Sequence, residues 1–261
     1  MKYRLATMAA ALIACASSTA QAVDSSASLK LSNLTFTAID LVPGDAQLPS
    51  YELLPNNAVS RATISRRANE SATSQTAQGL FAPVSLTLNG DPNVTASALV
   101  TTTGFEVAVT GTGVFDKVLA TASGSDSVSF ASRQIRLAPG TGIAITGQYD
   151  ISLNSVCPFA HPLCQATVGL NAQLLGTGWD SFDNGTFFSK SLSISGESRT
   201  LSGVAGTTYL NFTDQSVDLN FSFYGTVAIA SVPEPAVMGL MAAGFCTVAA
   251  TRRRRAKQAR A

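Results

Sequence analysis

Apolar and polar residues alternate along much of the chain between residues 84 and 229, with the period of a β-strand that has one buried face. The clearest run places Val217, Leu219, Phe221 and Phe223 at every second position. Shorter runs share this period, and their apolar members are Val84, Leu86 and Leu88; Phe105, Val107 and Val109; Val114 to Leu119; Val128 and Phe130; Ile135 and Leu137; Ile143 and Ile145; Tyr149, Ile151 and Leu153; Val168, Leu170, Ala172 and Leu174; Leu192 and Ile194; and Val227 and Ile229.

Turn sequences such as Asn89-Gly90-Asp91-Pro92 and Pro139-Gly140 separate these runs, so the pattern predicts roughly a dozen short strands. No part of residues 23–231 has a sustained apolar period of 3.6 residues, which disfavours α/β architectures. We therefore predict an all-β fold, an antiparallel two-sheet β-sandwich of jelly-roll-like type.

The region before residue 84 is harder to interpret. Apolar positions between Leu29 and Leu41 alternate in pairs with a slip between the pairs, which predicts a bulged or bent strand. A turn sequence follows at Val42-Pro43-Gly44-Asp45. From Pro49 to Gln78 the chain is polar, and we predict a long excursion, with a short helix between Ala58 and Ala77 as an alternative.

The N-terminus has the three parts of a secretory signal peptide. Met1 to Arg4 is short and basic, Leu5 to Ala16 is apolar, and Ala20-Gln21-Ala22 has the small residues of a signal-peptidase site. We predict that residues 1–22 form a signal helix removed after Ala22, so that the mature chain starts at Val23. In the alternative, Leu12 to Cys15 is a lipobox and the mature chain starts at a lipidated Cys15.

The C-terminus carries a short apolar segment followed by basic residues. Residues 236–251 contain no charged side chain, and sixteen residues in a helix would span about 24 Å, less than the roughly 30 Å of a bilayer core. The cluster Arg252, Arg253, Arg254 and Arg255 should keep residues 252–261 on the cytoplasmic side. We predict a short transmembrane helix that holds the preceding chain outside the inner membrane.

A motif of two prolines precedes this segment. Pro233 and Pro235 flank Glu234, and fixed φ angles without amide donors make Val232 to Pro235 extended and accessible to proteases. This motif, the apolar segment and the arginines together resemble the PEP-CTERM sorting signal of Gram-negative bacteria. The resemblance covers residues 232–255 alone. It implies recognition by an exosortase, cleavage at the motif and delivery to a cell surface that carries exopolysaccharide; an ordinary tail anchor is the alternative.

The net charge of the chain changes when the signal peptide and the basic C-terminal end are left out. Two basic residues lie in residues 1–22 and six follow Thr251, so nine of the seventeen Lys and Arg remain against sixteen Asp and Glu. The mature chain is then acidic, near −7. Nucleic-acid phosphates need clustered basic residues, so we expect no nucleic-acid partner.

Two cysteines remain in the body, residues 23–231. Cys157 and Cys164 enclose a short segment, and in an oxidising compartment such a pair predicts a disulfide. His161 lies between them, so the three side chains could also hold a metal. Three ligands leave a tetrahedral site incomplete, and we predict a disulfide loop and no metal or cofactor.

One loop has the composition of a ligand site. Trp179, the only tryptophan, precedes Asp180 and Asp183, and several phenylalanines follow. The aromatic residues could stack on sugar rings, and the oxygens could bind calcium, although the spacing is not that of an EF-hand. We keep Trp179, Asp180 and Asp183 as a candidate ligand loop, with an ordinary turn as the alternative.

We predict no catalytic residues. A Ser-His-Asp triad would have to use His161, and no Gly-x-Ser-x-Gly sequence is present. The predicted organisation is a signal peptide (1–22), a β-sandwich body (23–231) and a sorting tail (232–261). The predicted function is that of a non-enzymatic, exported surface or matrix protein, tethered to the inner membrane as a precursor and handled by signal peptidase and exosortase. Alternatives are a carbohydrate-binding module or, from paired carboxylates, a glycan hydrolase.

Overall fold

Fourteen β-strands form the part of the chain that the structure describes. A computed structural model gives the structure of residues 24–54, 58–66, 72–88, 93–112, 117–125, 133–155, 166–176, 186–194 and 197–230. The strands are β1 (Asp24–Asp40), β2 (Tyr51–Leu53), β3 (Val59–Arg66), β4 (Thr73–Gln78), β5 (Val84–Leu88), β6 (Val94–Thr101), β7 (Gly104–Thr112), β8 (Val118–Ser125), β9 (Ile135–Leu137), β10 (Thr141–Ser155), β11 (Ala166–Gly176), β12 (Thr186–Ile194), β13 (Ser198–Leu210) and β14 (Val217–Ile229). None of the described residues belongs to a helix long and apolar enough to cross a membrane.

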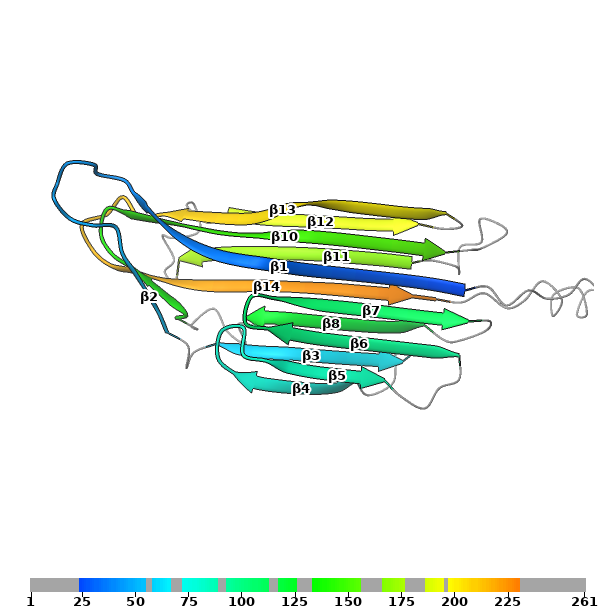
Figure 1. Cartoon of the computed structure of the whole chain (residues 1–261). Helices are drawn as coiled ribbons and strands as arrows, with labels where there is room; N and C mark the ends of the chain where they lie inside the picture. The colour runs from blue at the N-terminus through cyan, green and yellow to red at the C-terminus, as the bar shows by residue number, and fades with distance from the viewer. Residues whose placement is uncertain are drawn as a thin grey trace, which may run out of the picture. The chain divides into compact units, whose positions relative to one another are not determined.

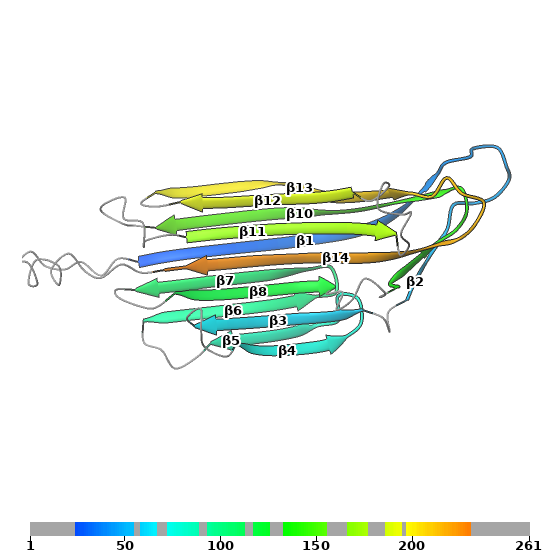
Figure 2. The same ribbon diagram turned by 180° about the vertical axis from the view of Figure 1, so that it is seen from behind.

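The strands form two antiparallel sheets (Figures 1 and 2). Sheet A has the order β13-β10-β1-β7-β6-β5, and sheet B has the order β12-β11-β14-β8-β3-β4. The short strands β2 and β9 extend sheet B beside β14. The predicted all-β, two-sheet antiparallel architecture is confirmed for the described residues.

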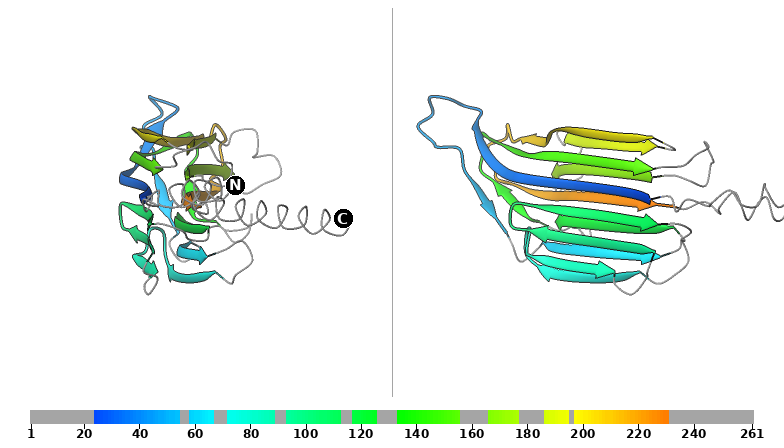
Figure 3. Two further views of the ribbon diagram at one scale, coloured as in Figure 1. Left: turned by 90° about the vertical axis from the view of Figure 1, so that its right-hand side faces the viewer. Right: turned by 45° about the vertical axis from the view of Figure 1, so that its right-hand side comes forward.

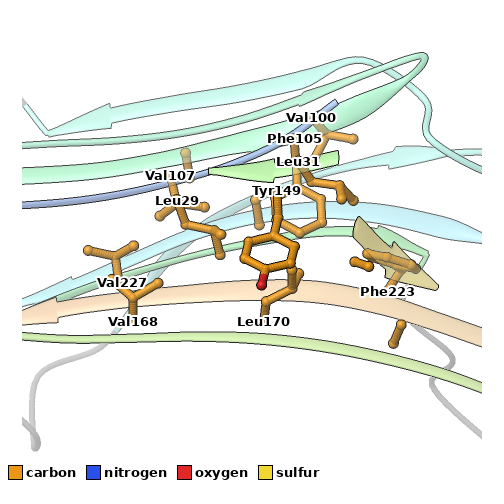
Figure 4. Packing of buried hydrophobic residues seen from close by; sticks show 14 of the residues in the cluster. Leu29, Leu31, Val100, Phe105, Val107, Tyr149, Val168, Leu170, Phe223 and Val227 are labelled. Atoms are coloured by element: carbon orange, nitrogen blue, oxygen red, sulfur yellow. The ribbon is translucent and has the colours of Figure 1, made fainter. Parts of the chain in front are cut away.

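The inward residues of both sheets make one hydrophobic core (Figure 4). Phe105 on β7 of sheet A contacts Phe223 on β14 of sheet B, with ring centroids 6.3 Å apart and edge-to-face geometry. Phe36 on β1 lies edge to face on Phe221 of β14, at 6.0 Å. Burial of such side chains is the main stabilising term, since each large apolar side chain removed from water contributes about 1.5–3 kcal/mol.

Strand β1 contains the predicted bulge. Its pairing with β10 shifts between Ser32 and Thr35, and Asn33 within the shift has a positive φ of 54°. Asparagine tolerates this left-handed conformation better than most residues. The Asn33 side chain donates a hydrogen bond to Gln148 Oε1 at 3.0 Å, which holds the bulge on its neighbour β10.

The prediction for residues 49–78 is wrong. The segment forms β2, β3 and β4 instead of an excursion or a helix. Alternation in β3 is real, but its buried positions include the small residues Ser60 and Ala62 beside Ile64, so the hydrophobic signal is weak. Ser60 is tolerated in the core because its Oγ donates to the carbonyls of Gly79 and Gly124, at 3.0 and 2.9 Å.

Two further strands, β6 and β13, escaped prediction. In two other places, a pair of predicted short strands forms one long strand. In β6 the inward residues include Ala96 and Ala98, whose small side chains give little signal. Strand β13 lies at the edge of sheet A, and only its second half has buried residues. Its exposed first half gives no alternating pattern. Residues 141–155 form one strand, β10, and residues 217–229 form one strand, β14.

The two ends of the body lie at the same end of the two sheets. Figure 2 shows the start of β1 and the end of β14 side by side at one end. The opposite end carries the loop of residues 41–50, the turn between β9 and β10 and the loop of residues 211–216 (Figure 3). The first and the last strand of the body therefore adjoin each other at this end.

Asn211 organises the loops of this opposite end. The side chain is buried, with Nδ2 donating to the carbonyls of Ala138 and Gln215 at 2.9 and 2.8 Å. Its Oδ1 accepts from the backbone N–H and the hydroxyl of Thr213, at 3.1 and 2.6 Å. All four hydrogen-bonding positions of the amide are used, so the loop of residues 211–216 is fixed against the β9–β10 turn.

We expect Asn211→Ala to lower the free energy of unfolding by about 1–3 kcal/mol, because it leaves carbonyl and N–H groups without their partner. Urea unfolding of the full-length chain, followed by far-ultraviolet circular dichroism, measures this change. Asn154→Ala is the matched control: its amide accepts from Ser198 at 2.6 Å at an exposed site, and the change should stay within about 0.5 kcal/mol. Equal midpoints for the two variants would contradict the structural role of Asn211.

Candidate functional site

The outer face of sheet B carries a row of hydroxyl side chains across adjacent strands. Thr226 on β14 pairs with Thr121 on β8, Thr121 with Thr63 on β3, and Thr63 with Ser74 on β4. Thr226, Thr121 and Thr63 point away from the core because the buried residues of their strands are their sequence neighbours, and Ser74 lies opposite Thr63 on the exposed edge strand β4. The row offers hydroxyl donors and acceptors at each strand, without a formal charge.

Tyr224 lies on the same face of sheet B, two residues before Thr226 on β14. The side chain is 40% exposed, and its cross-strand neighbours are Asn171 on β11 and Ser123 on β8. Ser123 in turn pairs with Arg61 on β3. A shallow hollow of about 280 Å³ opens beside the tyrosine, and we call it the Tyr224 hollow. Its lining residues are Arg61, Thr63, Thr121, Ala122, Ser123, Ser222, Tyr224 and Thr226.

Strand β8 has a bulge beside this hollow. Phe223 pairs with Ser125 and Tyr224 with Ser123, so Gly124 is an extra residue in β8. The Gly124 carbonyl accepts a hydrogen bond from the N–H of Phe81, at 2.6 Å, and one from Ser60. A Cβ at residue 124 would collide with the ring of Phe81, so only glycine permits this approach.

Ser123 precedes the bulged Gly124 and lines the hollow. Its Oγ is covered by other atoms and forms no hydrogen bond with any residue that the structure describes. Covered polar atoms are nearly always paired in folded proteins. The hollow thus combines an aromatic ring, a guanidinium and several hydroxyls, which suits a polar ligand held by hydrogen bonds and stacking. None of its described lining residues is a carboxylate that could act as a general acid or base.

A second hollow lies on the outer face of sheet A. Lys30 on β1 pairs with Asp150 on β10 and with Glu106 on β7, and these residues belong to a hollow of about 380 Å³. All three side chains are exposed. The two acids are two strands apart, about 9.5 Å by strand spacing, with a lysine between them. Such exposed charges pair with one another in water, and none of the Asp and Glu residues in the described ranges is buried.

A charged cluster joins β2, β9 and β14. Asp218 accepts from Arg136 Nε at 2.9 Å and lies 3.2 Å from Arg133 Nη1, while Glu52 lies 3.9 Å from Arg136. The hydrogen bond and the negative charge of Asp218 raise the pKa of Arg136. Each cation has an acidic partner, so the cluster fastens the short strands to β14. No group of three or more potential metal ligands occurs in the described ranges.

The residues predicted to be functional from the sequence fall outside the described ranges. These are Ala20 and Ala22; Cys157, His161 and Cys164; Trp179, Asp180 and Asp183; Val232, Pro233, Glu234 and Pro235; and Arg252, Arg253, Arg254 and Arg255. The strands before and after the candidate ligand loop are described: β11 ends at Gly176, which pairs with Leu219 on β14, and β12 begins at Thr186. The predictions for these residues remain predictions.

Tyr224 was not among the predicted site residues, although the sequence contains a signal for it. Leu219, Phe221 and Phe223 are the buried residues of β14, so the alternation places Tyr224 on the outer face. An aromatic residue on the solvent side of a strand is a candidate contact residue. The bulge beside the hollow has no comparable signal, because Gly124 in this bulge contacts residues distant in the sequence.

No family model matches this chain, and the comparison with curated proteins finds no match. Comparison with solved structures finds the vicilin from Solanum melongena, which is described as having different anionic ligands in structurally similar pockets. It has 11% sequence identity to this chain, covers 81% of this chain and 73% of its own, and has a TM-score of 0.12. The similarity is too low to indicate a shared fold or a shared ligand.

Proposed function

We propose that this chain is a non-enzymatic, exported protein of the bacterial cell surface or extracellular matrix, sorted through its PEP-CTERM signal by an exosortase and associated with exopolysaccharide. The single observation that carries the proposal is the C-terminal tail. The Pro-Glu-Pro motif, an apolar segment of sixteen residues and a cluster of four arginines follow one another at the end of the given sequence. The basic residues after the apolar segment favour a cytoplasmic position for that end.

The arrangement of the body is compatible with this route. The start of β1 and the end of β14 lie at the same end of the sheets, so the two strands that adjoin the signal peptide and the sorting tail in the sequence are neighbours there. A mature body near −7 would also be repelled by anionic lipid headgroups after release.

The finer features of the predicted structure belong to the same proposal. We propose a signal helix in residues 1–22, a short transmembrane helix in residues 236–251 and a disulfide between Cys157 and Cys164. We also propose a jelly-roll-like connectivity, which is supported by repeated crossings of the chain between sheets. The chain passes from β10 in sheet A to β11 and β12 in sheet B, returns to β13 in sheet A and ends at β14 in sheet B.

Intact-mass analysis of the protein recovered from the cell surface tests this proposal. We expect a chain that starts at Val23, ends within residues 232–235 and has a mass lower by the two thiol hydrogens of the disulfide. A start at a lipidated Cys15 would instead indicate lipoprotein processing, which leaves the C-terminal route intact. A surface protein that still contains Arg252 to Arg255 would refute exosortase processing.

A further inference from the structure

Tyr224 is surrounded on the outer face of sheet B by side chains shorter than its own. Along β14 its neighbours on this face are Ser222 and Thr226, and across the strands they are Asn171 and Ser123. The side chain is 40% exposed in spite of its place in an interior strand of the sheet. Short neighbours leave the tyrosine as the largest contact surface in this part of the face.

The polar groups around the tyrosine match a ligand rich in hydroxyls. Serine and threonine hydroxyls both donate and accept hydrogen bonds, as sugar hydroxyls do. Thr63, Thr121 and Thr226 supply such hydroxyls to the lining of the hollow. Arg61 adds the hydrogen-bond donors of its guanidinium to the lining.

The size of the hollow limits the kind of ligand. Sites that enclose a small molecule have volumes of roughly 300–1,000 Å³, and the Tyr224 hollow, at about 280 Å³, lies below that range. A shallow hollow of this size contacts part of a ligand and does not enclose it, as a site for one or two units of a surface-bound chain would. Thr226, Thr121 and Thr63 of the hydroxyl row line the hollow, and the row continues to Ser74 on β4.

We infer that the Tyr224 hollow binds a neutral polysaccharide in an extended conformation. One hexose ring stacks on Tyr224, its hydroxyls bond to Thr121 and Arg61, and the chain crosses the strands along the hydroxyl row. Neighbouring strands lie about 4.8 Å apart, close to the length of one ring along an extended β-linked chain. This inference rests on the proposed function for the source of the polysaccharide, the extracellular matrix.

The charge of the body favours a neutral chain over an acidic one. Arg61 is the one charged residue among those that line the hollow, whereas nine Lys and Arg face sixteen Asp and Glu in the chain without its basic ends. A polyanion would be repelled over most of its length. Stacking and hydroxyl contacts, in contrast, do not depend on the net charge.

Calorimetric titration of the full-length chain in mild detergent with cellohexaose tests the inference. We expect saturable binding, a loss of at least tenfold in affinity for Tyr224→Ala and a change of less than about twofold for Tyr224→Phe, which keeps the ring. Thr121→Val should weaken binding several-fold by removing a hydroxyl from the lining. Phe212→Ala is the matched control, since it removes an aromatic side chain that is 70% exposed on a distant loop, and its affinity should equal that of the wild type.

Three results would overturn the inference: no binding of cellohexaose by the wild type, equal affinity for Tyr224→Ala and the wild type, or binding of oligogalacturonate without binding of cellohexaose. Circular dichroism of each variant confirms that the sheets are intact, and Thr121→Val gives a second measurement if Tyr224→Ala fails to fold. The titration does not require export, so its failure leaves the sorting proposal untouched. Conversely, failure of the mass analysis leaves the titration valid.

Discussion

Phe221→Ala is expected to lower the free energy of unfolding by about 3–5 kcal/mol, the usual cost of removing a buried phenylalanine ring. Phe221 is fully buried, and its ring lies against those of Phe36, Phe81 and Phe223, with centroids 6.0, 6.4 and 5.8 Å apart. These rings come from both sheets and from the connection before β5. Truncation leaves a cavity that the surrounding β-strands can fill only by shifting together.

The backbone of Phe221 restricts such a shift. Its N–H donates to Oε1 of the buried Gln134 at 2.6 Å, and its carbonyl accepts from the hydroxyl of Ser125 at 3.0 Å. Because the strand is held on both sides, the cavity should persist and the cost should not fall to the low end of the range. A loss of this size is a large fraction of the roughly 5–15 kcal/mol of a typical domain.

Thermal unfolding of the full-length chain measures the effect. For a domain of this size, each kcal/mol lost from the free energy of unfolding lowers the melting temperature by about 2–4 °C. The melting temperature of Phe221→Ala should therefore fall by roughly 6–20 °C. Phe212→Ala removes the same ring from a side chain that is 70% exposed, and it should change the free energy of unfolding by no more than about 0.5 kcal/mol. If both variants melt together with the wild type, the aromatic core is not placed as the structure has it.

The strands that the sequence predicts are those whose buried face is made of large apolar residues. In β14, Leu219, Phe221 and Phe223 alternate with smaller or polar residues, and this period of two predicts a strand and not a helix. In β3 the inward positions include Ser60 and Ala62, and Ser60 is accommodated because its hydroxyl bonds to the carbonyls of Gly79, after β4, and Gly124, in β8. Contacts of that kind depend on the tertiary structure, so a pattern along the chain cannot reveal them.

Two of the edge strands, β4 and β13, escaped prediction for a different reason. Nearly all of β4 is exposed, since it pairs with β3 on one side and ends sheet B on the other. The first half of β13 is exposed in the same way at the edge of sheet A. An edge strand buries less apolar surface and is often polar, which limits sheet-to-sheet aggregation. Polarity in this protein is therefore a property of strands at the edge as much as of loops.

The candidate site could be predicted only in part. Alternation in β14 places Tyr224 outside the core, but the hollow beside it is lined by residues of β3, β8 and β14, which only the tertiary structure brings together. The partners of Tyr224 come from β3, β8 and β11, strands far apart in sequence. The sorting tail is the opposite case, since its residues are consecutive and its chemistry can be recognised without a fold.

Changing Pro233, Glu234 and Pro235 together to alanine should abolish processing, so that nearly all of the protein stays in the inner membrane at full length. The physical reason lies in the backbone: two prolines keep the motif extended, whereas three alanines could continue the apolar segment as a helix. A helical motif would neither present an extended substrate nor keep Glu234 for recognition. The apolar segment and the arginines are untouched, so membrane retention should continue.

Immunoblots of inner-membrane, surface and medium fractions, with an antibody against the body, measure the distribution. A matched control changes Lys257, Gln258 and Arg260 to alanine, which also replaces three residues of the tail but leaves the motif and the four arginines in place. We expect the control to be processed and released like the wild type, because the arginines next to the apolar segment are sufficient to fix its orientation. Release of a mature body from the triple variant at the wild-type level would show that the motif does not direct processing, and the tail would then be an ordinary membrane anchor.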